Sequence, residues 1–336
     1  MTTVVYADLR WQTGTGIGAV KSELLARVSS ELSIVDLCIG ARIGSPWSPM
    51  AISAALSKRR PTTGVFWSPG YMPPMTARLP AVVTVHDLTH LHYYTEFHAV
   101  YYNAVMRRLY RRCRAIICVS EYTRAELVEW SGISADRVWT VPNGVSPKFF
   151  RETDGFGLEF PYILYPGNRR AYKNIGRMLQ AYAESGLSKE GIHFVLTGAE
   201  NKRLQRLIEE MRLSNCVHFV GYVSEGDMVR LYRGATLIAF VSLYEGFGLP
   251  IAEGMAAGVP VVTSNVSAMP EVAGGAAVLV DPTAVPEIAE AMRKASLDQE
   301  YRKRLITLGK VRAREFDWDI AAQKVWKIIR DAAKSW

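Results

Sequence analysis

Short runs of apolar residues alternate along the whole chain with longer segments whose apolar positions recur every three or four residues. The short runs have the length of buried strands, and the longer segments have the period of amphipathic helices. Strands that alternate with helices predict parallel sheets covered by helices on both faces. The chain is therefore expected to have an α/β fold.

The expected strands fall into two sets of six. The first set is 4–7, 33–38, 64–67, 82–85, 116–119 and 138–141, and the second is 162–165, 193–196, 217–220, 237–240, 259–263 and 277–280. The segment 151–157 between the sets is polar and carries glycine, which is the composition of a linker. We therefore expect two similar domains, 1–152 and 158–316, with the last helix, in 317–336, returning to the first domain.

Composition adds that the protein is globular. Of its 336 residues, 49% are hydrophobic and 21% are charged, a balance that excludes disordered, collagenous and coiled-coil chains. The longest apolar run, around 235–244, has about ten residues, well short of the roughly 18 that a membrane-spanning helix needs. The first apolar residues are not preceded by a basic segment, so no cleaved signal peptide is expected. We expect a cytoplasmic location.

Basic residues are concentrated in the first half of the chain. The formal net charge is +8, and residues 1–155 hold 17 Lys and Arg against 12 Asp and Glu. A helical pattern over 101–114 joins Tyr101, Tyr102 and Met106 to five arginines, Arg107, Arg108, Arg111, Arg112 and Arg114. We expect the first four of these arginines to contact the anionic inner face of a membrane. A solvated helix face is the alternative, and nucleic acid is not expected because no aromatic residues alternate with the arginines in a strand pattern.

A glycine-rich loop follows the first expected strand. Gly14, Gly16 and Gly18 let the backbone approach a ligand, and the following helix start favours negative charge. With Ala19, this loop also fits the fingerprint of a nicotinamide dehydrogenase, for which Asp36 would be the ribose acid. Asp36 is expected in the middle of a strand, whereas that acid should close it. A phosphate or sugar contact is the favoured interpretation, and a plain tight turn stays open.

Two clusters suggest a metal and have simpler explanations. Four histidines, His86, His90, His92 and His98, follow the strand 82–85, but their spacing matches no established ligand pattern. We expect one functional histidine, His86 at the strand tip, oriented by Asp87. Asp317 and Asp319 lie at the start of the last helix, where aspartate is a preferred capping residue. No metal site is expected.

Two turns in the second half each lie between an expected strand and a helical segment. The first contains Arg169 and Lys173, whose charges suit a diphosphate. The second is rich in glycine and places Pro250 in the first helical turn, so that free backbone N–H groups face an anion. Glu245 and Glu253 bracket this second turn and point to different parts of one ligand. Both turns are therefore expected to hold an anionic ligand.

A run of motifs over 221–274 is specific enough to suggest a family. Its segments are 221–224, 231–235, 245–253, 257–262 and 270–274, and in the first half 86–88, 119–120 and 141–145 fit the same pattern. With these segments the chain resembles the family-4 retaining glycosyltransferases, whose fold is GT-B. Glu245 and Glu253, with seven residues between them, match the paired glutamates of that family. Members of this kind often build bacterial surface polysaccharides.

The resemblance implies two Rossmann-like domains that face a cleft. The first domain, 1–152 with 317–336, would take the acceptor, and the second, 158–316, would bind the nucleotide sugar donor. Glu253 would hold the ribose hydroxyls of the donor, and Lys173 matches the lysine that contacts the diphosphate. Tyr172 stands where the family often has arginine, so Arg169 is expected to supply the second cation.

The remaining site residues are also assigned by the resemblance. Glu245 would address the sugar, together with the backbone of Phe247, Gly248 and Leu249. His86 would contact the sugar that is transferred. The residues expected to complete the donor site are Gly14, Gly16 and Gly18 of the first domain and Asn168, Gly221, Tyr222 and Val223 of the second.

The implied reaction is transfer of a hexose with retention at the anomeric carbon, without a required metal or cofactor. Mannose from GDP-mannose is the favoured donor, and a saccharide or a lipid-diphosphate-linked saccharide is the expected acceptor. Lys173, Arg169 and the helix start after Glu245 would stabilise the departing diphosphate. We favour attack from the front face, and a double displacement stays open. A dehydrogenase that uses 14–19 and a non-catalytic sugar- or lipid-binding module are the alternative functions.

Overall fold

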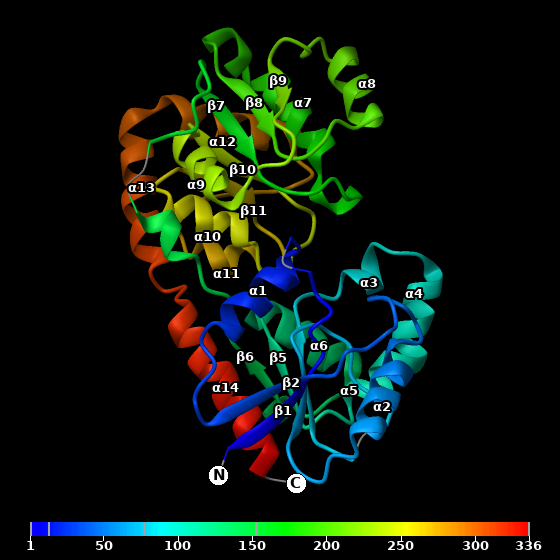
Figure 1. Cartoon of the computed structure of the whole chain (residues 1–336). Coiled ribbons are helices and arrows are strands. Elements are labelled where there is room, and N and C mark those ends of the chain that lie inside the picture. Colours follow the sequence, from blue (N-terminus) through cyan, green and yellow to red (C-terminus); the bar gives the residue numbers. More distant parts are fainter. Residues whose placement is uncertain (1, 13, 77, 152–153, 335–336) are drawn as a thin grey trace. The chain divides into compact units, whose positions relative to one another are not determined.

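The computed structural model describes residues 2–12, 14–76, 78–151 and 154–334 and divides into two compact units (Figure 1). Unit 1 comprises Met1–Gly144 and Asp317–Trp336, and unit 2 comprises Val145–Phe316. The division lies before the expected linker 151–157, of which Glu152 and Thr153 are outside the described residues.

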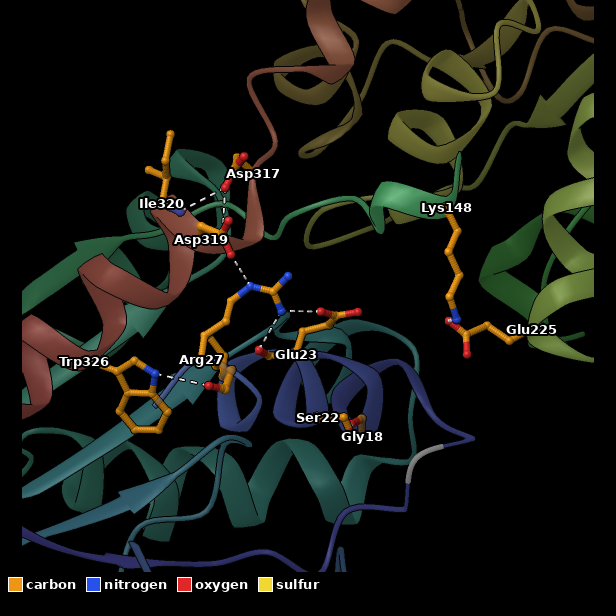
Figure 2. A network of polar contacts seen from close by, with 11 residues as sticks. Gly18, Ser22, Glu23, Arg27, Lys148, Glu225, Asp317, Asp319, Ile320 and Trp326 are labelled. Atoms are coloured by element: carbon orange, nitrogen blue, oxygen red, sulfur yellow. Dashed lines mark hydrogen bonds and ion pairs between the residues drawn. The ribbon is translucent and has the colours of Figure 1, made fainter. Parts of the chain in front are cut away.

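The earlier boundary has a physical cause. The backbone N–H of Val145 donates to the carbonyl of Phe316, at 2.9 Å, so the two chain crossings are tied together at the edge of unit 2. The short 3-10 helix η3 (Pro147–Phe150) then packs in unit 2, where Phe149 meets Tyr232 edge to face at 5.2 Å. Lys148 pairs with Glu225 at 2.9 Å, as Figure 2 shows. Residues 145–150 therefore belong to the second unit.

Unit 1 is built on a six-stranded parallel sheet in the order β2-β1-β3-β4-β5-β6. Its strands are β1 (Thr3–Ala7), β2 (Leu32–Asp36), β3 (Val65–Ser68), β4 (Ala81–Val85), β5 (Ala115–Cys118) and β6 (Val138–Thr140). Its α-helices are α1 (Gly16–Leu25), α2 (Ser48–Arg59), α3 (Thr89–His92), α4 (Glu96–Tyr101), α5 (Arg107–Tyr110), α6 (Glu121–Ser131) and α14 (Trp318–Lys334). A π-helix, η1 (Tyr102–Met106), joins α4 to α5, and a 3-10 turn, η2 (Ala135–Arg137), precedes β6.

Unit 2 has a second six-stranded parallel sheet in the order β12-β11-β10-β7-β8-β9. Its strands are β7 (Tyr162–Tyr165), β8 (His193–Leu196), β9 (Val217–Phe219), β10 (Leu237–Phe240), β11 (Val261–Ser264) and β12 (Val278–Val280). Its α-helices are α7 (Ile175–Ser185), α8 (Lys202–Glu210), α9 (Glu225–Gly234), α10 (Leu249–Ala256), α11 (Met269–Ala273), α12 (Val285–Leu297) and α13 (Gln299–Ala313). The 3-10 turns η4 (Ala171–Lys173) and η5 (Leu187–Glu190) flank α7.

The predicted α/β class and all twelve predicted strands are confirmed. The end of β2 differs from the prediction in a way that matters, because Asp36 is its last residue. Its carboxylate accepts a hydrogen bond from the N–H of Cys38, at 2.9 Å, and Cys38 takes a positive φ of 48°. The Asp36 side chain thus turns the chain out of the sheet. The argument that Asp36 lies inside a strand was wrong.

The last helix packs on unit 1, as predicted. Trp326 of α14 is buried, meets Trp67 of β3 edge to face at 4.9 Å, and donates its indole N–H to the carbonyl of Leu24 at 3.2 Å. Trp318, at the start of α14, lies so close to Gly144 that a Cβ on this residue would be 2.5 Å from the Trp318 ring. Ser335 and Trp336 of the predicted segment lie outside the described residues.

The acidic residues at the start of α14 serve the helix. Asp317 accepts hydrogen bonds from the N–H groups of Asp319, at 2.6 Å, and Ile320, at 3.0 Å, so it caps the helix as predicted. Arg27 bridges Asp319, at 2.5 Å, and Glu23, at 2.6 Å, which fastens α14 to α1 (Figure 2). Both aspartates therefore have a structural role.

No helix of the described residues combines the length and the apolar character needed to cross a membrane.

We predict that Trp326→Ala destabilises unit 1 by about 3–5 kcal/mol, because it empties a buried site where α14 meets the sheet. Trp139, which is half exposed on β6, supplies the matched control. Trp139→Ala should change the free energy of unfolding by about 1 kcal/mol or less. Urea unfolding followed by circular dichroism measures both variants, and equal losses would contradict the packing of α14 described above.

Candidate active site

The carboxyl ends of β7 and β10 hold a buried ion pair. Lys173 follows β7 in η4 and Glu245 follows β10, and the lysine Nζ lies 2.6 Å from the glutamate Oε1. The two side chains are only 11% and 12% exposed. The rings of Tyr172 and Phe240 lie 5.2 and 5.1 Å from the same Nζ, which adds cation–π attraction. The lysine that sequence reasoning singled out is therefore a fixed positive charge.

This pair lies where the direction of the strand connections reverses. β7 and β10 are neighbours in the sheet, β8 and β9 continue on one side of β7, and β11 and β12 continue on the other side of β10. Ligands of open α/β sheets bind in the crevice beyond the carboxyl ends of the strands at such a reversal. The topology therefore places both charged residues at the expected ligand site of unit 2.

The turn after β10 presents backbone N–H groups. The N–H of Glu245 donates to the Ser267 Oγ at 3.0 Å, which holds the turn in place. Gly248 adopts a φ of 101° immediately before α10, a conformation that side chains rarely adopt. No side chain caps α10, and Pro250 lies in its first turn. Within this turn the N–H of Ile251 bonds to the Gly248 carbonyl, so the N–H of Leu249 and the positive helix end are the features that favour an anion.

Glu253 lies one turn further along α10 and has a different environment. The hydroxyl of Tyr232 donates to its Oε2 at 2.7 Å. Burial raises the pKa of the Glu253 carboxyl, and this hydrogen bond offsets part of the rise. Glu245 and Glu253 therefore have separate partners, Lys173 and Tyr232. Tyr232 was not singled out from the sequence, although it lies in the motif at 231–235.

The carboxyl ends of β8 and β9 are joined by glycines. Gly198 and Gly221 form an isolated bridge, with the Gly198 N–H donating to the Gly221 carbonyl at 2.6 Å, and both have positive φ. Tyr222 is 92% exposed, and Val223 beside it is half-buried. The bridge therefore holds an exposed aromatic ring beyond the strand ends. A ring in this position can stack on a planar ligand.

Arg169 and Asn168 have mainly structural contacts. The Arg169 guanidinium donates to the carbonyls of Thr197, at 2.7 Å, and Gly198, at 3.3 Å, and lies 5.1 Å from the centre of the Phe219 ring. Asn168 Oδ1 accepts from the N–H of Arg170 at 3.2 Å. Arg169 therefore braces the turn after β7 against β8, while the partner of Lys173 is Glu245.

In unit 1, the glycine loop leads into α1. Thr15 Oγ1 accepts from the N–H of Gly18 at 3.0 Å and donates to the carbonyl of Gln12 at 2.8 Å, which caps the helix that begins at Gly16. A Cβ at Gly14 or Gly16 would meet no atom within 4 Å, so open space lies beside both. Thr13 lies outside the described residues.

A buried ion pair that sequence reasoning missed supports this loop. Asp8 is fully buried and binds Arg10 through both oxygens, at 2.8 Å to Nε and 2.7 Å to Nη2. Arg10 also donates to the carbonyl of Ala41 at 2.6 Å, and Lys21 donates to the carbonyl of Trp11 at 2.7 Å. The sequence signal was an acid and a base two residues apart at a strand end, which is common on protein surfaces too.

His86 follows β4 and is held by one ring nitrogen. Its Nε2 lies 2.7 Å from the carbonyl oxygen of Pro69, and because a carbonyl only accepts, Nε2 carries the proton. Burial lowers the pKa of His86, so the ring is neutral near pH 7 and its Nδ1 is an acceptor. Pro69 follows β3, which neighbours β1 in the sheet. His86 is therefore anchored where β3 and β4 meet, next to the β1–β3 position at which the connections of this sheet reverse.

The other histidines of the cluster have separate partners. His90 stacks between Tyr94 and Tyr102, at 4.4 and 4.9 Å, and His92 pairs with Glu126 at 2.5 Å. The described residues contain no group of three or more His, Cys, Asp or Glu placed to hold a metal ion.

Comparisons with known proteins identify the family. Residues 148–312 match the model for glycosyl transferases group 1, and residues 39–149 match that for glycosyltransferase family 4. The chain is 31% identical over 265 residues to the O-antigen chain mannosyltransferase B of Escherichia coli, covering 74% of this chain and 69% of that protein. The chain belongs to the family-4 glycosyltransferases.

Other relatives agree with this assignment. The serotype-specific mannosyltransferase WbdA of Escherichia coli is 27% identical over 225 residues, which are 62% of this chain and 28% of that longer protein. Among solved structures, the complex of Anabaena Alr3699/HepE with UDP and glucose has a TM-score of 0.76 at 15% identity, covering 98% of this chain and 100% of that one. The glycosyltransferase WaaG, from lipopolysaccharide biosynthesis, has a TM-score of 0.76 at 15% identity, covering 97% and 99%. The predicted GT-B fold is confirmed, and membership of this family favours a transferase over a dehydrogenase or a binding module.

We predict that Lys173→Met lowers the stability of this glycosyltransferase by about 3–5 kcal/mol, because the Glu245 carboxylate loses its partner in a buried site. The double variant K173M/E245Q should recover most of that loss. Urea unfolding gives the coupling energy between the two residues. The control is Lys303→Met, which breaks the exposed pair with Glu300 and should cost about 1 kcal/mol at most. A coupling energy near zero would contradict the buried pair.

Proposed function

We propose that this glycosyltransferase moves mannose from GDP-mannose to a saccharide or lipid-linked saccharide in bacterial surface-polysaccharide synthesis, with retention at the anomeric carbon. The main supporting observation is the buried Lys173–Glu245 pair beside the uncapped start of α10. The mannose assignment is supported by the relatives from Escherichia coli, which are named as mannosyltransferases. We assign donor binding to unit 2 and acceptor binding to unit 1.

The donor is proposed to bind along the carboxyl ends of the unit 2 strands. Glu253 would accept the ribose hydroxyls through Oε1, since Tyr232 holds Oε2. Tyr222 offers an exposed ring to the base, with Gly221, Val223 and Asn168 along the same edge. The diphosphate would meet the Lys173 ammonium and the N–H groups of Phe247, Gly248 and Leu249. For unit 1 we propose that Gly14 and Gly16 supply further N–H groups to it, while the N–H of Gly18 stays bonded to Thr15 Oγ1 and its missing side chain keeps the loop open.

The transfer step follows from these charges. The bond between the anomeric carbon and the diphosphate oxygen breaks, the acceptor hydroxyl oxygen bonds to that carbon on the same face, and the hydroxyl proton passes to the leaving phosphate oxygen. Lys173 and the helix start stabilise the negative charge as it develops. Fixed positive groups already perform the task of a divalent cation, so we propose that no metal is required. Neutral His86 would accept a hydrogen bond at Nδ1 from one hydroxyl of the transferring sugar, and Glu245 would accept a hydrogen bond from another hydroxyl.

We predict transfer of mannose from GDP-mannose to a lipid-linked acceptor in the presence of EDTA, and 10- to 100-fold weaker GDP binding by Glu253→Gln. The weakening is that expected when a charged hydrogen-bond acceptor, worth about 1.5–3 kcal/mol, is replaced. Because burial raises the Glu253 pKa, GDP affinity should also fall as the pH drops toward that value and the carboxyl is protonated. Calorimetry and a radiolabelled transfer assay measure these effects.

The matched control is Glu271→Gln, a carboxylate in α11 outside the proposed donor contacts. It should leave GDP affinity unchanged. Unaltered GDP binding in Glu253→Gln would remove the ribose assignment. Transfer that stops in EDTA and returns with added metal would overturn the metal-independent step.

The four arginines of the proposed membrane contact all have backbone partners. Arg107 and Arg111 donate to the carbonyl of Ser131, at 3.4 and 2.6 Å, and so serve the carboxyl end of α6. Tyr102 and Met106 are buried in the core of unit 1. Their helical spacing was read correctly, but their apolar side chains cover the sheet. Arg108 and Arg112 also donate to carbonyls, those of Ala104 and Met75, and both are exposed on the protein surface.

An exposed apolar stripe supports this contact. Phe97 and Val100 of α4 are 62% and 64% exposed, and Arg108 continues their helix face. Trp47 and Met50, at the start of α2, are also exposed. Tyr101 of α4 donates to the carbonyl of Pro46, at 2.9 Å, so the two exposed pairs lie on neighbouring segments. Aromatic and aliphatic side chains next to arginine suit the interface of an anionic membrane. We propose that the lipid-linked acceptor is reached there.

We predict that R108Q/R112Q lowers binding to vesicles of phosphatidylglycerol by roughly 30-fold at low salt, since each basic residue contributes about 1 kcal/mol there. F97S/V100S should lower it at all salt concentrations, because the apolar contribution is not screened. L308S/V311S, an exposed apolar pair on α13, is the control. Equal sedimentation of all variants with vesicles would show the stripe to be an ordinary solvated surface.

A further inference from the structure

A basic cavity of about 970 Å³ lies within unit 2 at the beginning of α7 and α8. Among its lining residues are six basic side chains and one carboxylate, namely Arg169, Arg170, Arg177, Lys202, Arg203, Arg206 and Glu210. Its volume is that of pockets that take small organic ligands. The imbalance of charge makes the cavity a candidate for an anion.

The cations contributed by α8 are not neutralised by neighbouring carboxylates. Within the described part of the chain, Lys202, Arg203 and Arg206 form no ion pair. Glu200, just before α8, accepts from Gln205 Nε2 at 2.6 Å, and among the described residues Glu209 and Glu210 of α8 form no ion pair with these cations. Like charges gathered around one concavity raise the local potential and attract a counter-ion. A bound anion would relieve this repulsion.

Backbone geometry adds to the positive potential. The first turns of α7 and α8 both line the cavity, through residues that include Ile175, Gly176 and Leu204. Asn174 precedes α7 without capping it by its side chain, whereas Asn201 caps α8 by accepting from Arg203 and Leu204 N–H groups. Two helix starts therefore carry partial positive charge toward the same space as the six cations.

The cavity is separate from the proposed donor site but connected to it. Lys173, Glu245 and Glu253 do not line it. Asn174, the residue after Lys173, donates to the carbonyls of Val241 at 3.0 Å and Pro282 at 2.7 Å and accepts from Arg177 Nη1 at 3.0 Å. A ligand that binds Arg177 therefore contacts a side chain bonded to Asn174, and Asn174 directly follows Lys173 of the donor-site ion pair.

We propose that this cavity binds a small soluble molecule with two or more phosphate groups, in addition to the donor. Two phosphates match the high charge of the cavity, and its concave shape and volume of about 970 Å³ suit a small molecule better than a flat membrane surface. The proposal does not rest on the identity of the donor sugar or of the acceptor. It gives the cavity a regulatory or second-substrate role that acts through Asn174.

The test uses the full chain and fructose 1,6-bisphosphate and inorganic triphosphate as probes. Calorimetric titration is done with and without saturating GDP. We expect one binding event for the probe under both conditions, weakened at least tenfold by K202Q/R203Q/R206Q, with GDP affinity of that variant unchanged. The control K189Q/R304Q/R314Q removes three exposed cations of unit 2 that do not line the cavity and should bind the probe normally.

Three outcomes would overturn the proposal. Loss of the probe's heat when GDP is present would place the probe in the donor site. An equal weakening in the control variant would reduce the effect to net charge. Probe binding that is absent while vesicles of phosphatidylglycerol bind through Lys202, Arg203 and Arg206 would assign the cations to a membrane surface. Thermal melting of both triple variants verifies that they fold.

Discussion

The buried ion pair between Lys173 and Glu245 depends on its position at the carboxyl ends of two neighbouring strands, β7 and β10. Two nearly buried charges are costly to desolvate and need each other, together with polarisable neighbours, to remain ionised. At the carboxyl ends of β7 and β10 the strand connections diverge, so the side chains after both strands reach a common crevice. The rings of Tyr172 and Phe240 lie against the lysine ammonium, and the start of α10 adds positive potential beside it. The turns, glycines and hydroxyls of unit 2 are arranged around that constraint.

Unit 1 solves a similar problem with a different set of residues. Its connections reverse between β1 and β3, and the glycine loop follows β1 while Pro69 follows β3. Asp8 is neutralised by Arg10 before the loop begins, so the buried charge supports the backbone and does not face a ligand. His86 is anchored to Pro69 as a neutral ring. In the proposed ligand contacts, this unit would therefore offer backbone N–H groups and a neutral acceptor, whereas unit 2 would offer charge.

The strands could be predicted because both faces of each sheet are covered, which makes buried strands visible as short apolar runs. The paired glutamates and Lys173 could be found because turns after strands carry ligand chemistry. The features that could not be predicted depend on interactions that no periodicity encodes. Asp36 ends β2 by bonding to the Cys38 N–H, Arg107 and Arg111 serve the Ser131 carbonyl, and Arg169 is bound by two carbonyls of another loop. In each case a charged side chain serves the backbone, and sequence alone does not distinguish that role from ligand binding.

Tyr172 shows how a site can retain its charge balance after one cation is replaced. Where the family often has arginine, this chain has a buried aromatic ring beneath Lys173. An arginine there would add a second positive charge beside a lysine already paired with Glu245, whereas the tyrosine strengthens the single charge by cation–π attraction. In the donor binding proposed above, the diphosphate would then rely more on backbone N–H groups, in a turn fixed by Gly248, Pro250 and the bond from Glu245 to Ser267. Fixed dipoles need no reorganisation as charge develops on the leaving group, so in the proposed transfer step the replacement would shift stabilisation from a side chain to the backbone.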